Sequence, residues 1–352
     1  MNWKKVQIIT DNCEKVSAQA PLIVSASRST DIPAFYADWF FNRLKNGYSA
    51  WINPFNGVKS YVSYEDVRFI VFWSKNPKPL LKHLPYLRER GINCYIQYTL
   101  NDYVSEKLEM GVPSLKDRID TFKRLSDYLG KDKIIWRFDP LILTDRISVD
   151  DLIDKIAVIG EQLKDYTNKL VFSFADIIEY GKVRKNLENS GVKYRNFTPD
   201  EMNYLAASLS DVNKRWSLEL ATCAEKVDLD KYGISHNRCV DDRLMAKIAW
   251  QDEVLMKFLG MEVVHHFGSD FGTVLPPDAI VINDTIYVIR KKDNKDKGQR
   301  LLCGCAISKD IGQYNTCAHL CEYCYANAGK EAARDNYKRH LANPDGECII
   351  NV

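Results

Sequence analysis

The chain has 352 residues, of which 45% are hydrophobic and 27% are charged, which is the balance of a soluble globular protein. That length suits one large α/β domain or two ordinary ones with a large buried core. With a net charge of only +2, the protein as a whole does not attract nucleic acid or an anionic membrane strongly, although a local basic patch is compatible with this charge. The N-terminal residues lack an apolar signal-peptide core, and no apolar run approaches about 20 residues. We therefore expect a cytoplasmic protein with no membrane contact.

Short runs rich in Val, Ile, Phe and Tyr recur along the chain and predict β-strands. Between them, apolar residues at spacings of three and four predict helices, one of which runs from Leu115 to Leu129. Ser148 and Thr198 are each followed three residues later by an acid, which is typical of a helix start. An Asn-Gly pair among alternating apolar residues predicts a hairpin around 50–63. The six runs expected as strands are 22–27, 68–73, 93–99, 133–138, 169–174 and 216–221.

The alternation of strand and helix, repeated about six times, predicts an α/β fold with a parallel sheet and helices packed outside it. We expect a parallel (β/α) barrel or partial barrel, since the pattern alone does not decide whether the sheet closes. Residues 1–260 form the expected barrel core. Residues 261–352 form a cysteine-rich C-terminal segment that packs on it.

Polar side chains gather where the predicted strands end. Ser27 ends one run, Lys75 and Cys223 follow two others, and Arg137 and Asp139 lie at the end of a fourth. In α/β barrels the active site is built at these carboxyl ends, although polar residues also occur wherever a buried strand leaves the core. Arg137 offers a planar fork for carboxylate or phosphate, and Asp139 is held extended by the proline that follows it. We expect this pair to contact substrate as catalytic residues, with a structural ion pair as the alternative.

The chain has ten cysteines, and five of them fall within residues 303–324. In a reducing compartment such a cluster indicates metal binding rather than a disulfide framework. Those that follow the spacing C-x3-C-x2-C are Cys317, Cys321 and Cys324. One short loop with three thiolates suits a 4Fe-4S cluster, in which the fourth iron stays open for a small chelating ligand. Zinc is the alternative, with His319 or a cysteine of the 303–305 pair as the fourth ligand.

A second group of cysteines forms a separate four-thiolate set. Its members are Cys223, Cys239, Cys303 and Cys305. We expect a second, auxiliary 4Fe-4S cluster here, which would relay electrons or contact substrate. A structural zinc that pins residues 303–305 to the barrel is the alternative, and spacing alone does not separate iron from zinc. His236 is a candidate substitute ligand, whereas Cys94 lies in an apolar run and is expected to be a small buried hydrophobic residue.

The pattern C-x3-C-x-aromatic-C, with Tyr323 as the aromatic residue, resembles the signature of the radical S-adenosylmethionine (SAM) superfamily. The extension "CEYCYAN" (321–327) resembles the spore photoproduct lyase branch. The segments "SASRSTD" (25–31) and "WSKNP" (73–77) resemble that branch's serine-rich segment and its lysine-terminated strand. As a whole, the chain resembles the family catalogued as domain of unknown function 1848.

The position of the cysteine loop departs from the pattern of most radical SAM enzymes. There the loop follows the first barrel strand, whereas here it comes last, and the chain opens with what resembles the second strand. A circular permutation reconciles the two orders. On this hypothesis the C-terminal segment fills the first-strand place beside residues 22–27, and the loop lies close to Ser27 and Lys75.

The resemblance implies an enzyme that cleaves SAM reductively at a 4Fe-4S cluster, to a 5′-deoxyadenosyl radical that abstracts hydrogen from a substrate. It implies that Lys75 binds the SAM carboxylate, that Ser27 hydrogen-bonds SAM, and that Tyr323 and Tyr325 lie at the cofactor site. The implied partner is an electron donor such as flavodoxin or ferredoxin. The substrate is unidentified, with nucleic acid as one candidate. The competing hypotheses are a zinc-stabilised ligand- or nucleic-acid-binding module and a metal-dependent hydrolase, whose His/Asp ligand series the sequence lacks.

Overall fold

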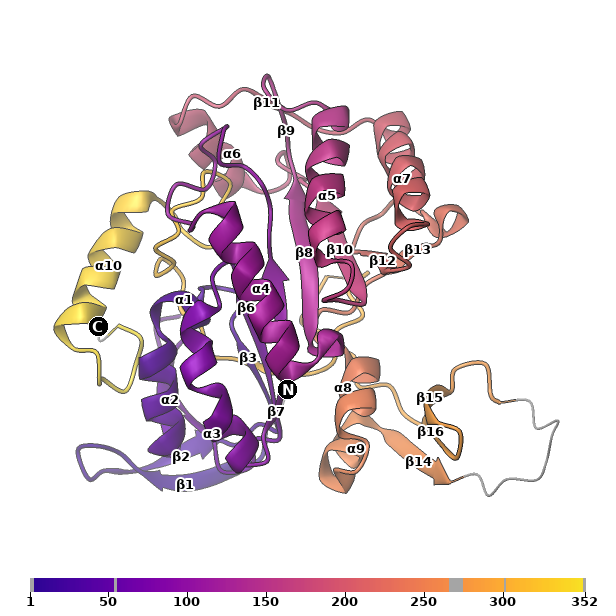
Figure 1. Ribbon diagram of the computed structural model, residues 1–352. Coiled ribbons are helices and arrows are strands. Elements are labelled where there is room, and N and C mark those ends of the chain that lie inside the picture. The colour runs from indigo at the N-terminus through magenta and orange to yellow at the C-terminus, as the bar shows by residue number, and fades with distance from the viewer. Residues whose placement is uncertain (1–2, 54–55, 266–274, 301, 351–352) are drawn as a thin grey trace.

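The computed structural model describes residues 3–53, 56–265, 275–300 and 302–350. At its centre lies an eight-stranded sheet in which every neighbouring pair of strands is parallel (Figure 1). From one edge to the other, the strands are β13 (Ile234–His236), β12 (Glu219–Thr222), β10 (Lys169–Phe174), β8 (Ile134–Leu141), β7 (Asn93–Thr99), β6 (Phe69–Ser74), β3 (Ile23–Ala26) and β17 (Lys309–Asp310). The predicted α/β fold with a parallel sheet is therefore confirmed.

The sheet is open within the described part of the chain, because β13 and β17 at its two edges do not pair with each other. The strands of the described ranges therefore do not close into a barrel. The six predicted strands correspond to β3, β6, β7, β8, β10 and β12. The two edge strands have three and two residues, which is too short to give a readable pattern.

The last strand, β17, pairs in parallel with β3, with Lys309 opposite Val24 and Asp310 opposite Ser25. The C-terminal segment thus folds back beside the first strand of the central sheet in chain order. This is the place that the permutation hypothesis assigns to it. The cysteine loop follows β17 directly, so it leaves from the carboxyl edge of the sheet.

Helices cover one face of the sheet and pack into the main core. α4 (Leu115–Leu129) spans the predicted residues, and α5 (Val149–Leu163) and α7 (Pro199–Asn213) begin with capping boxes at Ser148 and Thr198, as predicted. The remaining helical segments that contribute to this core or connect its elements are α1 (Ile32–Phe35), α2 (Ala37–Lys45), α3 (Leu84–Glu89), α6 (Gly181–Asn189), η1 (Lys78–Lys82), η2 (Lys131–Lys133) and η3 (Asp230–Tyr232).

The opposite face of the sheet is covered by described residues within 239–265, 275–300 and 302–306. Val71, Tyr95 and Ile135 belong to this second core, whereas their chain neighbours belong to the main core, as the two-residue period of a strand requires. The covering elements form the lobe at the lower right of Figure 1. They are α8 (Asp242–Ala249), α9 (Glu253–Leu259), β14 (Met261–His265), β15 (Ile280–Asn283) and β16 (Ile286–Arg290).

Smaller elements complete the fold. A second sheet contains β1 (Lys5–Ile9), β2 (Lys15–Gln19), β5 (Lys59–Ser63) and β4 (Tyr48–Ile52), in that order. Strands β4 and β5 pair antiparallel and form the predicted hairpin, although residues 54–55 within its turn lie outside the described residues. The short strands β9 (Leu143–Thr144) and β11 (Tyr194–Arg195) pair with each other, and α10 (Lys330–Ala342) follows the cysteine loop.

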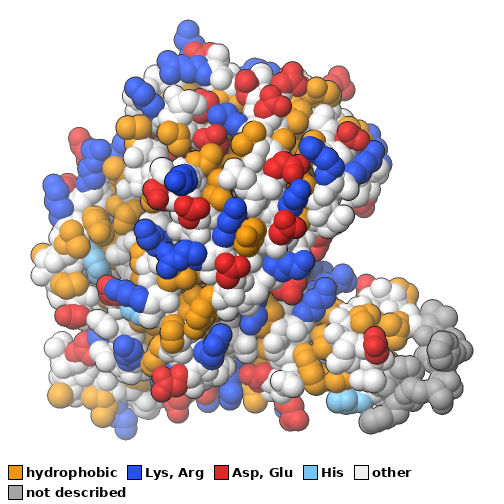
Figure 2. Space-filling view, in the orientation of Figure 1, with side chains coloured by type: hydrophobic (Ala, Val, Ile, Leu, Met, Phe, Trp, Pro, Cys, Tyr) orange, Lys and Arg blue, Asp and Glu red, His pale blue; other side chains and the backbone are white. Residues whose placement is uncertain are grey.

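The surface carries both signs of charge. Acidic and basic side chains are interspersed over the face drawn in Figure 2, in keeping with the net charge of +2. None of the helices in the described ranges combines the length and the apolar character needed to cross a membrane.

Candidate metal and cofactor site

The cysteine loop is fixed at the carboxyl edge of the sheet by Asp310, the last residue of β17. Its carboxylate accepts hydrogen bonds from Ser25 Oγ (2.9 Å), Ser27 Oγ (2.8 Å) and the backbone N–H of Arg28 (2.8 Å). Three donors from the end of β3 therefore converge on one acidic side chain. This arrangement brings the loop next to Ser27, as the permutation hypothesis requires. It also leaves the Ser27 hydroxyl bonded to protein rather than free for a ligand.

Lys75 and Tyr323 meet in a buried network around Glu109. The Lys75 ammonium donates to Glu109 Oε1 at 2.7 Å and to the Tyr323 hydroxyl at 2.9 Å. The same carboxylate oxygen accepts hydrogen bonds from Asn101 Nδ2 at 3.2 Å and from the Tyr323 hydroxyl. Burial acts to raise the pKa of Glu109, but the charges of Lys75 and Arg118 outweigh it and hold that pKa below its usual value. The lysine expected to bind the SAM carboxylate is thus paired with a carboxylate of the protein.

His319 anchors the middle of the loop. Its Nε2 lies 2.7 Å from Asp31 Oδ2, its Nδ1 lies 3.1 Å from the Gly111 carbonyl oxygen, and its side chain is buried. The Gly111 N–H in turn donates to the carbonyl of His319 at 3.0 Å. Since both ring nitrogens have protein partners, this histidine is not placed as the fourth ligand of a zinc ion. The donor set of the loop is therefore thiol only.

The three loop thiols lie in a common, largely buried environment. Burial raises the pKa of Cys321 well above its ordinary value, and the nearby charges of Cys317 and Cys324 raise it further, while Lys75 acts to lower it. Burial likewise raises the pKa of the other two thiols. Three neighbouring buried thiols become thiolates together only when cations neutralise them, and bound metal supplies that charge. The donor set therefore fits an iron–sulfur cluster held at three corners.

Tyr325, the other tyrosine of the motif, points back to the first strand of the central sheet in chain order. Its hydroxyl donates to the backbone carbonyl of Arg28, and 48% of its surface is exposed. Tyr323, by contrast, is buried. The two tyrosines that flank Cys324 therefore hold the loop in place: Tyr325 contacts Arg28, just beyond the end of β3, and Tyr323 contacts the Lys75 network.

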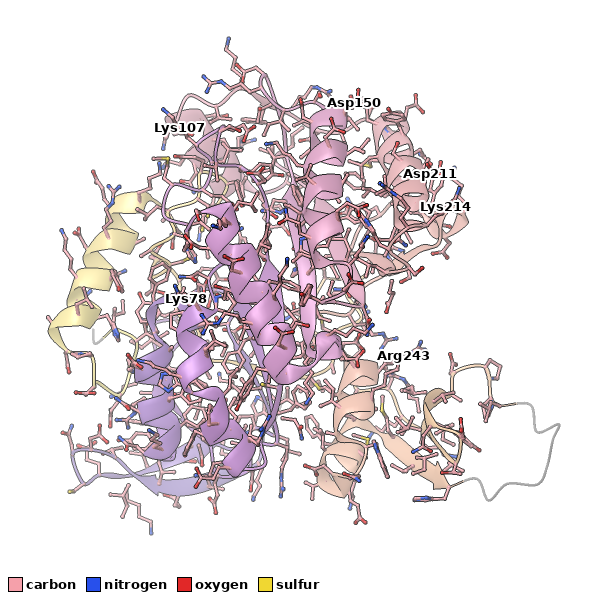
Figure 3. The ribbon with its side chains drawn as sticks, in the orientation of Figure 1. Lys78, Lys107, Asp150, Asp211, Lys214 and Arg243 are labelled. Carbon is pink, nitrogen blue, oxygen red and sulfur yellow. The ribbon has the colours of Figure 1, made fainter. Side chains whose placement is uncertain are left out.

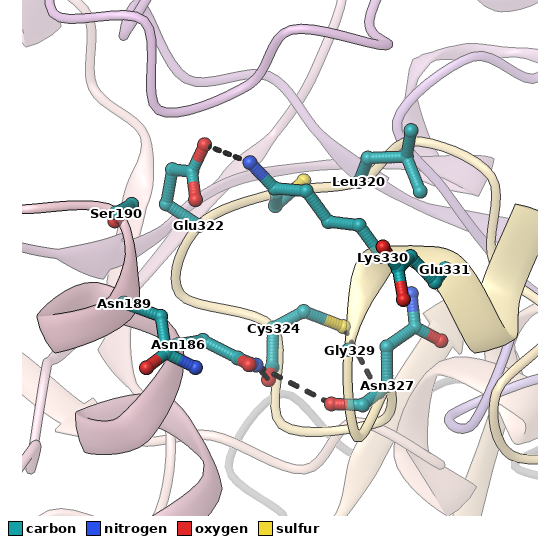
Figure 4. Close-up of a pocket in the computed structure, with 11 residues that line it drawn as sticks. Asn186, Asn189, Ser190, Leu320, Glu322, Cys324, Asn327, Gly329, Lys330 and Glu331 are labelled. Atoms are coloured by element: carbon teal, nitrogen blue, oxygen red, sulfur yellow. Dashed lines mark hydrogen bonds and ion pairs between the residues drawn. The ribbon is translucent and has the colours of Figure 1, made fainter.

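A cavity of about 270 Å³ opens beside Cys321 and Cys324 (Figure 4). Its wall includes Asn186 of α6, whose amide donates to the Cys324 carbonyl at 2.9 Å, and the ion pair between Lys330 and Glu322. Amide, ammonium and carboxylate groups thus line a space directly against the thiols. Such a space suits a small polar ligand that reaches the metal centre.

The second cysteine group is also brought together. Cys223 Sγ and Cys239 Sγ lie 3.4 Å apart, and Cys305 Sγ accepts hydrogen bonds from the backbone N–H groups of Cys239 (3.2 Å) and Val240 (3.3 Å). A side-chain contact with Cys305 lowers the pKa of the Cys303 thiol to about 6. His236, the candidate substitute ligand, is exposed at the end of β13.

Arg137 and Asp139 face this second group. Arg137 Nε donates to Asp139 Oδ2 at 3.1 Å, and one terminal nitrogen donates to Gln97 Oε1 at 3.1 Å and to Cys239 Sγ at 3.2 Å. Asp139 also accepts a hydrogen bond from the Ser173 hydroxyl. Most donors of the guanidinium are therefore used within the protein, and the pair is built into the wall of the cysteine group. Its expected contact with substrate stays a prediction.

Two acidic residues of the site were not foreseen from the sequence. Glu109 lies in an irregular connection, and Asp310 ends a strand of two residues, so neither stands in a pattern that would mark it. Throughout the described ranges, no group of three or more His, Cys, Asp or Glu side chains is already placed to hold a single metal ion. The loop cysteines would meet a cluster at three separate irons, so they need not converge on one point.

Fold and site together define an α/β protein whose parallel sheet carries two groups of cysteines, one of them in a loop at the carboxyl edge of its strands. The chain belongs to the family described as domain of unknown function (DUF1848), whose sequence profile matches residues 23–326. Neither the curated proteins nor the solved structures contain a match to it.

Proposed function

We propose that this protein is a radical SAM iron–sulfur enzyme. The observation that carries the proposal is the position of the C-x3-C-x2-C loop. Its thiols interact electrostatically with one another in a largely buried loop, close to Lys75 and beside a cavity. That loop follows β17 at the carboxyl edge of a parallel sheet, where Asp310 accepts a hydrogen bond from Ser27. Active sites of parallel α/β folds are built at this edge.

Cys317, Cys321 and Cys324 would hold three corners of a 4Fe-4S cluster. When bound and reduced by a flavodoxin- or ferredoxin-type donor, the cluster supplies the electron that cleaves SAM to a 5′-deoxyadenosyl radical, which takes a hydrogen atom from the substrate. The backbone N–H of Asn327 donates to Cys324 Sγ at 3.3 Å, and a hydrogen bond to a ligand sulfur raises the reduction potential of such a centre. The Lys75 ammonium adds positive charge close to Cys321.

The surrounding residues would orient the ligand and keep water away. The cavity beside Cys321 and Cys324 offers the amide of Asn186 and the Lys330–Glu322 pair to a bound amino acid moiety. Because the Asn186 amide and the Lys330–Glu322 pair line the same cavity, they would together fix the orientation of the zwitterionic amino acid moiety. The buried Tyr323, whose hydroxyl contacts Lys75 and Glu109, would help to exclude water from the loop.

The test is anaerobic purification of the full chain, with iron, sulfide and zinc counted and the electron paramagnetic resonance of the reduced protein recorded with and without SAM. The proposal predicts about four irons and four sulfides at the loop, and a spectrum that changes when SAM is added. The Cys321→Ala variant should lose this iron and SAM cleavage. Cys94→Ala removes a buried cysteine of β7 instead and should retain both. Zinc at the loop, with no iron or sulfide there, would refute the proposal.

A further inference from the structure

The second cysteine group joins three segments of the chain, two from one edge of the sheet and one that leads to the other edge. Cys223 follows β12 and Cys239 follows β13, at one edge of the sheet. Cys303 and Cys305 lie in the segment that leads to β17, at the other edge. That segment packs into the second core, where the Ala306 N–H donates to the Val240 carbonyl at 2.9 Å. The four thiols therefore meet where the segment leading to β17 contacts the residues that follow β12 and β13.

The sulfur spacing favours one ion over a cluster. Zn–S bonds of about 2.3 Å at the tetrahedral angle place two thiolates about 3.8 Å apart, close to the 3.4 Å between Cys223 Sγ and Cys239 Sγ. A cubane binds each thiolate through a different iron, and its ligand sulfurs stand farther apart. Cys305 further contacts the side chains of both Cys239 and Cys303, which links all four thiols in one chain of contacts. Because no three of them yet surround a common point, metal binding must rotate at least one of these side chains.

Guanidinium groups surround the same thiols. One terminal nitrogen of Arg137 lies 3.2 Å from Cys239 Sγ, and one of Arg300 lies 3.8 Å from Cys223 Sγ. The Arg28 guanidinium interacts electrostatically with the 303–305 thiols, and one of its nitrogens is buried without a hydrogen-bond partner. Four thiolates around a divalent cation carry a net charge of about −2. Arg137 is buried and pairs with Asp139, so metal-bound thiolates would add counter-charge beside it, which neutral thiols do not provide.

We propose that Cys223, Cys239, Cys303 and Cys305 bind one zinc ion in a closed tetrahedral site. The ion ties the segment leading to β17 to the ends of β12 and β13, and so fixes the strand from which the C-x3-C-x2-C loop leaves. A closed Cys₄ site has no open position, so its role is structural. It does not depend on the chemistry of the loop. Arg137 is a positioning residue of this site.

The experiment uses the full-length protein and element-specific X-ray absorption. At the zinc edge we expect one zinc per chain with four sulfur neighbours at about 2.3 Å. Cys239→Ser should lose the zinc, whereas the matched buried-cysteine variant Cys94→Ser should keep it. Should Cys239→Ser fail to fold, Co²⁺ loading of the wild-type chain should still give the visible spectrum of a tetrahedral thiolate site.

Three results would overturn the zinc assignment. The first is that the chain is purified without zinc and gives no tetrahedral spectrum with Co²⁺. The second is that the Cys239→Ser variant retains its zinc. The third is that the Cys317→Ala/Cys321→Ala/Cys324→Ala variant contains iron with an iron–iron scattering path. The last result would show that the second group holds a cluster. Zinc content is read separately from iron and SAM cleavage, so failure of this assignment and failure of the proposed enzyme function are distinguishable.

Discussion

Glu109→Gln is the most direct perturbation of the network under the cysteine loop. The Glu109 side chain has no exposed surface, and the Lys75 side chain has 16%. Glutamine keeps the shape and one carbonyl oxygen but removes the charge. The Lys75 ammonium, 2.7 Å away in the native protein, is then left without its counter-ion in a mostly buried position.

The size of the effect follows from that burial. Removal of one partner of a buried ion pair costs about 3–5 kcal/mol, because the other charge stays behind uncompensated. We expect the lower end of this range, since Lys75 retains some contact with water. Asp211→Asn in α7 is the control, because its pair with Lys214 is 76% exposed on both sides (Figure 3). An exposed pair of this kind contributes little to the free energy of unfolding, because water screens both charges.

Urea unfolding of the two variants and the wild type measures the difference in the free energy of unfolding. The direction in which this difference changes with pH tests the charge on Glu109. The pKa of Glu109 is lowered in the folded protein, so its contribution to the free energy of unfolding is present above the unfolded pKa of 4.5 and is lost as the pH falls through the lower folded value. The gap between wild type and Glu109→Gln should therefore be full at pH 7 and shrink in acid. A variant at pH 7 no less stable than Asp211→Asn would refute this account of the network.

Two further substitutions test the anchoring of the two cysteine groups. Arg137→Met should weaken zinc retention against a chelator by about 10–100-fold, because it removes the donor 3.2 Å from Cys239 Sγ. Arg195→Met on the surface is the control and should leave zinc retention unchanged. Equal zinc retention in the two variants would contradict the role given to Arg137. His319→Ala should lower the free energy of unfolding by about 1–3 kcal/mol and speed amide hydrogen exchange over residues 316–324, since the buried Asp31 carboxylate loses one of its hydrogen-bond partners. His236→Ala, an exposed site, is the control, and unchanged exchange in His319→Ala would show that the histidine does not hold the loop.

The fold could be predicted wherever the sequence repeats a period over many residues. The run at 93–99 matches β7, and the helical face from Leu115 matches α4, because burial on one side imposes a pattern on the whole element. The capping boxes at Ser148 and Thr198 were predictable because each depends only on a hydroxyl and an acid three residues apart. Strand β17 has only two residues and is defined by its pairing with β3. No local sequence pattern could therefore predict it.

The candidate site divides in the same way. The cysteines were identifiable because spacing of a reactive residue type is itself a signal. Their surroundings were not, because Glu109 and Asp310 act through partners more than 30 and 280 residues away in the chain. The pairing of Arg137 with Cys239 spans 102 positions. Long-range pairs of this kind depend on the sheet order, and one sequence does not encode that order in any local pattern.

The approach of the loop to β3 at Gly312 offers a final test of where that loop lies. A methyl group at this position would overlap Ser27 Oγ and stand 2.5 Å from Ser29 Oγ. The backbone has little freedom to withdraw, because the Gly312 N–H donates to Asp310 at 2.9 Å and its carbonyl accepts from Trp51 Nε1 at 3.0 Å.

Gly312→Ala must therefore displace either the serine-rich segment or the start of the cysteine loop. Overpacking of this kind costs about 1–3 kcal/mol, and the displaced loop should also hold less iron after anaerobic reconstitution. Gly329→Ala, at the other end of the same loop, is the matched control because its added methyl group meets no atom within 4 Å. Equal stability and equal iron content in the two variants would mean that the loop does not lie against Ser27, and the placement of the cluster at this edge of the sheet would then have to be abandoned.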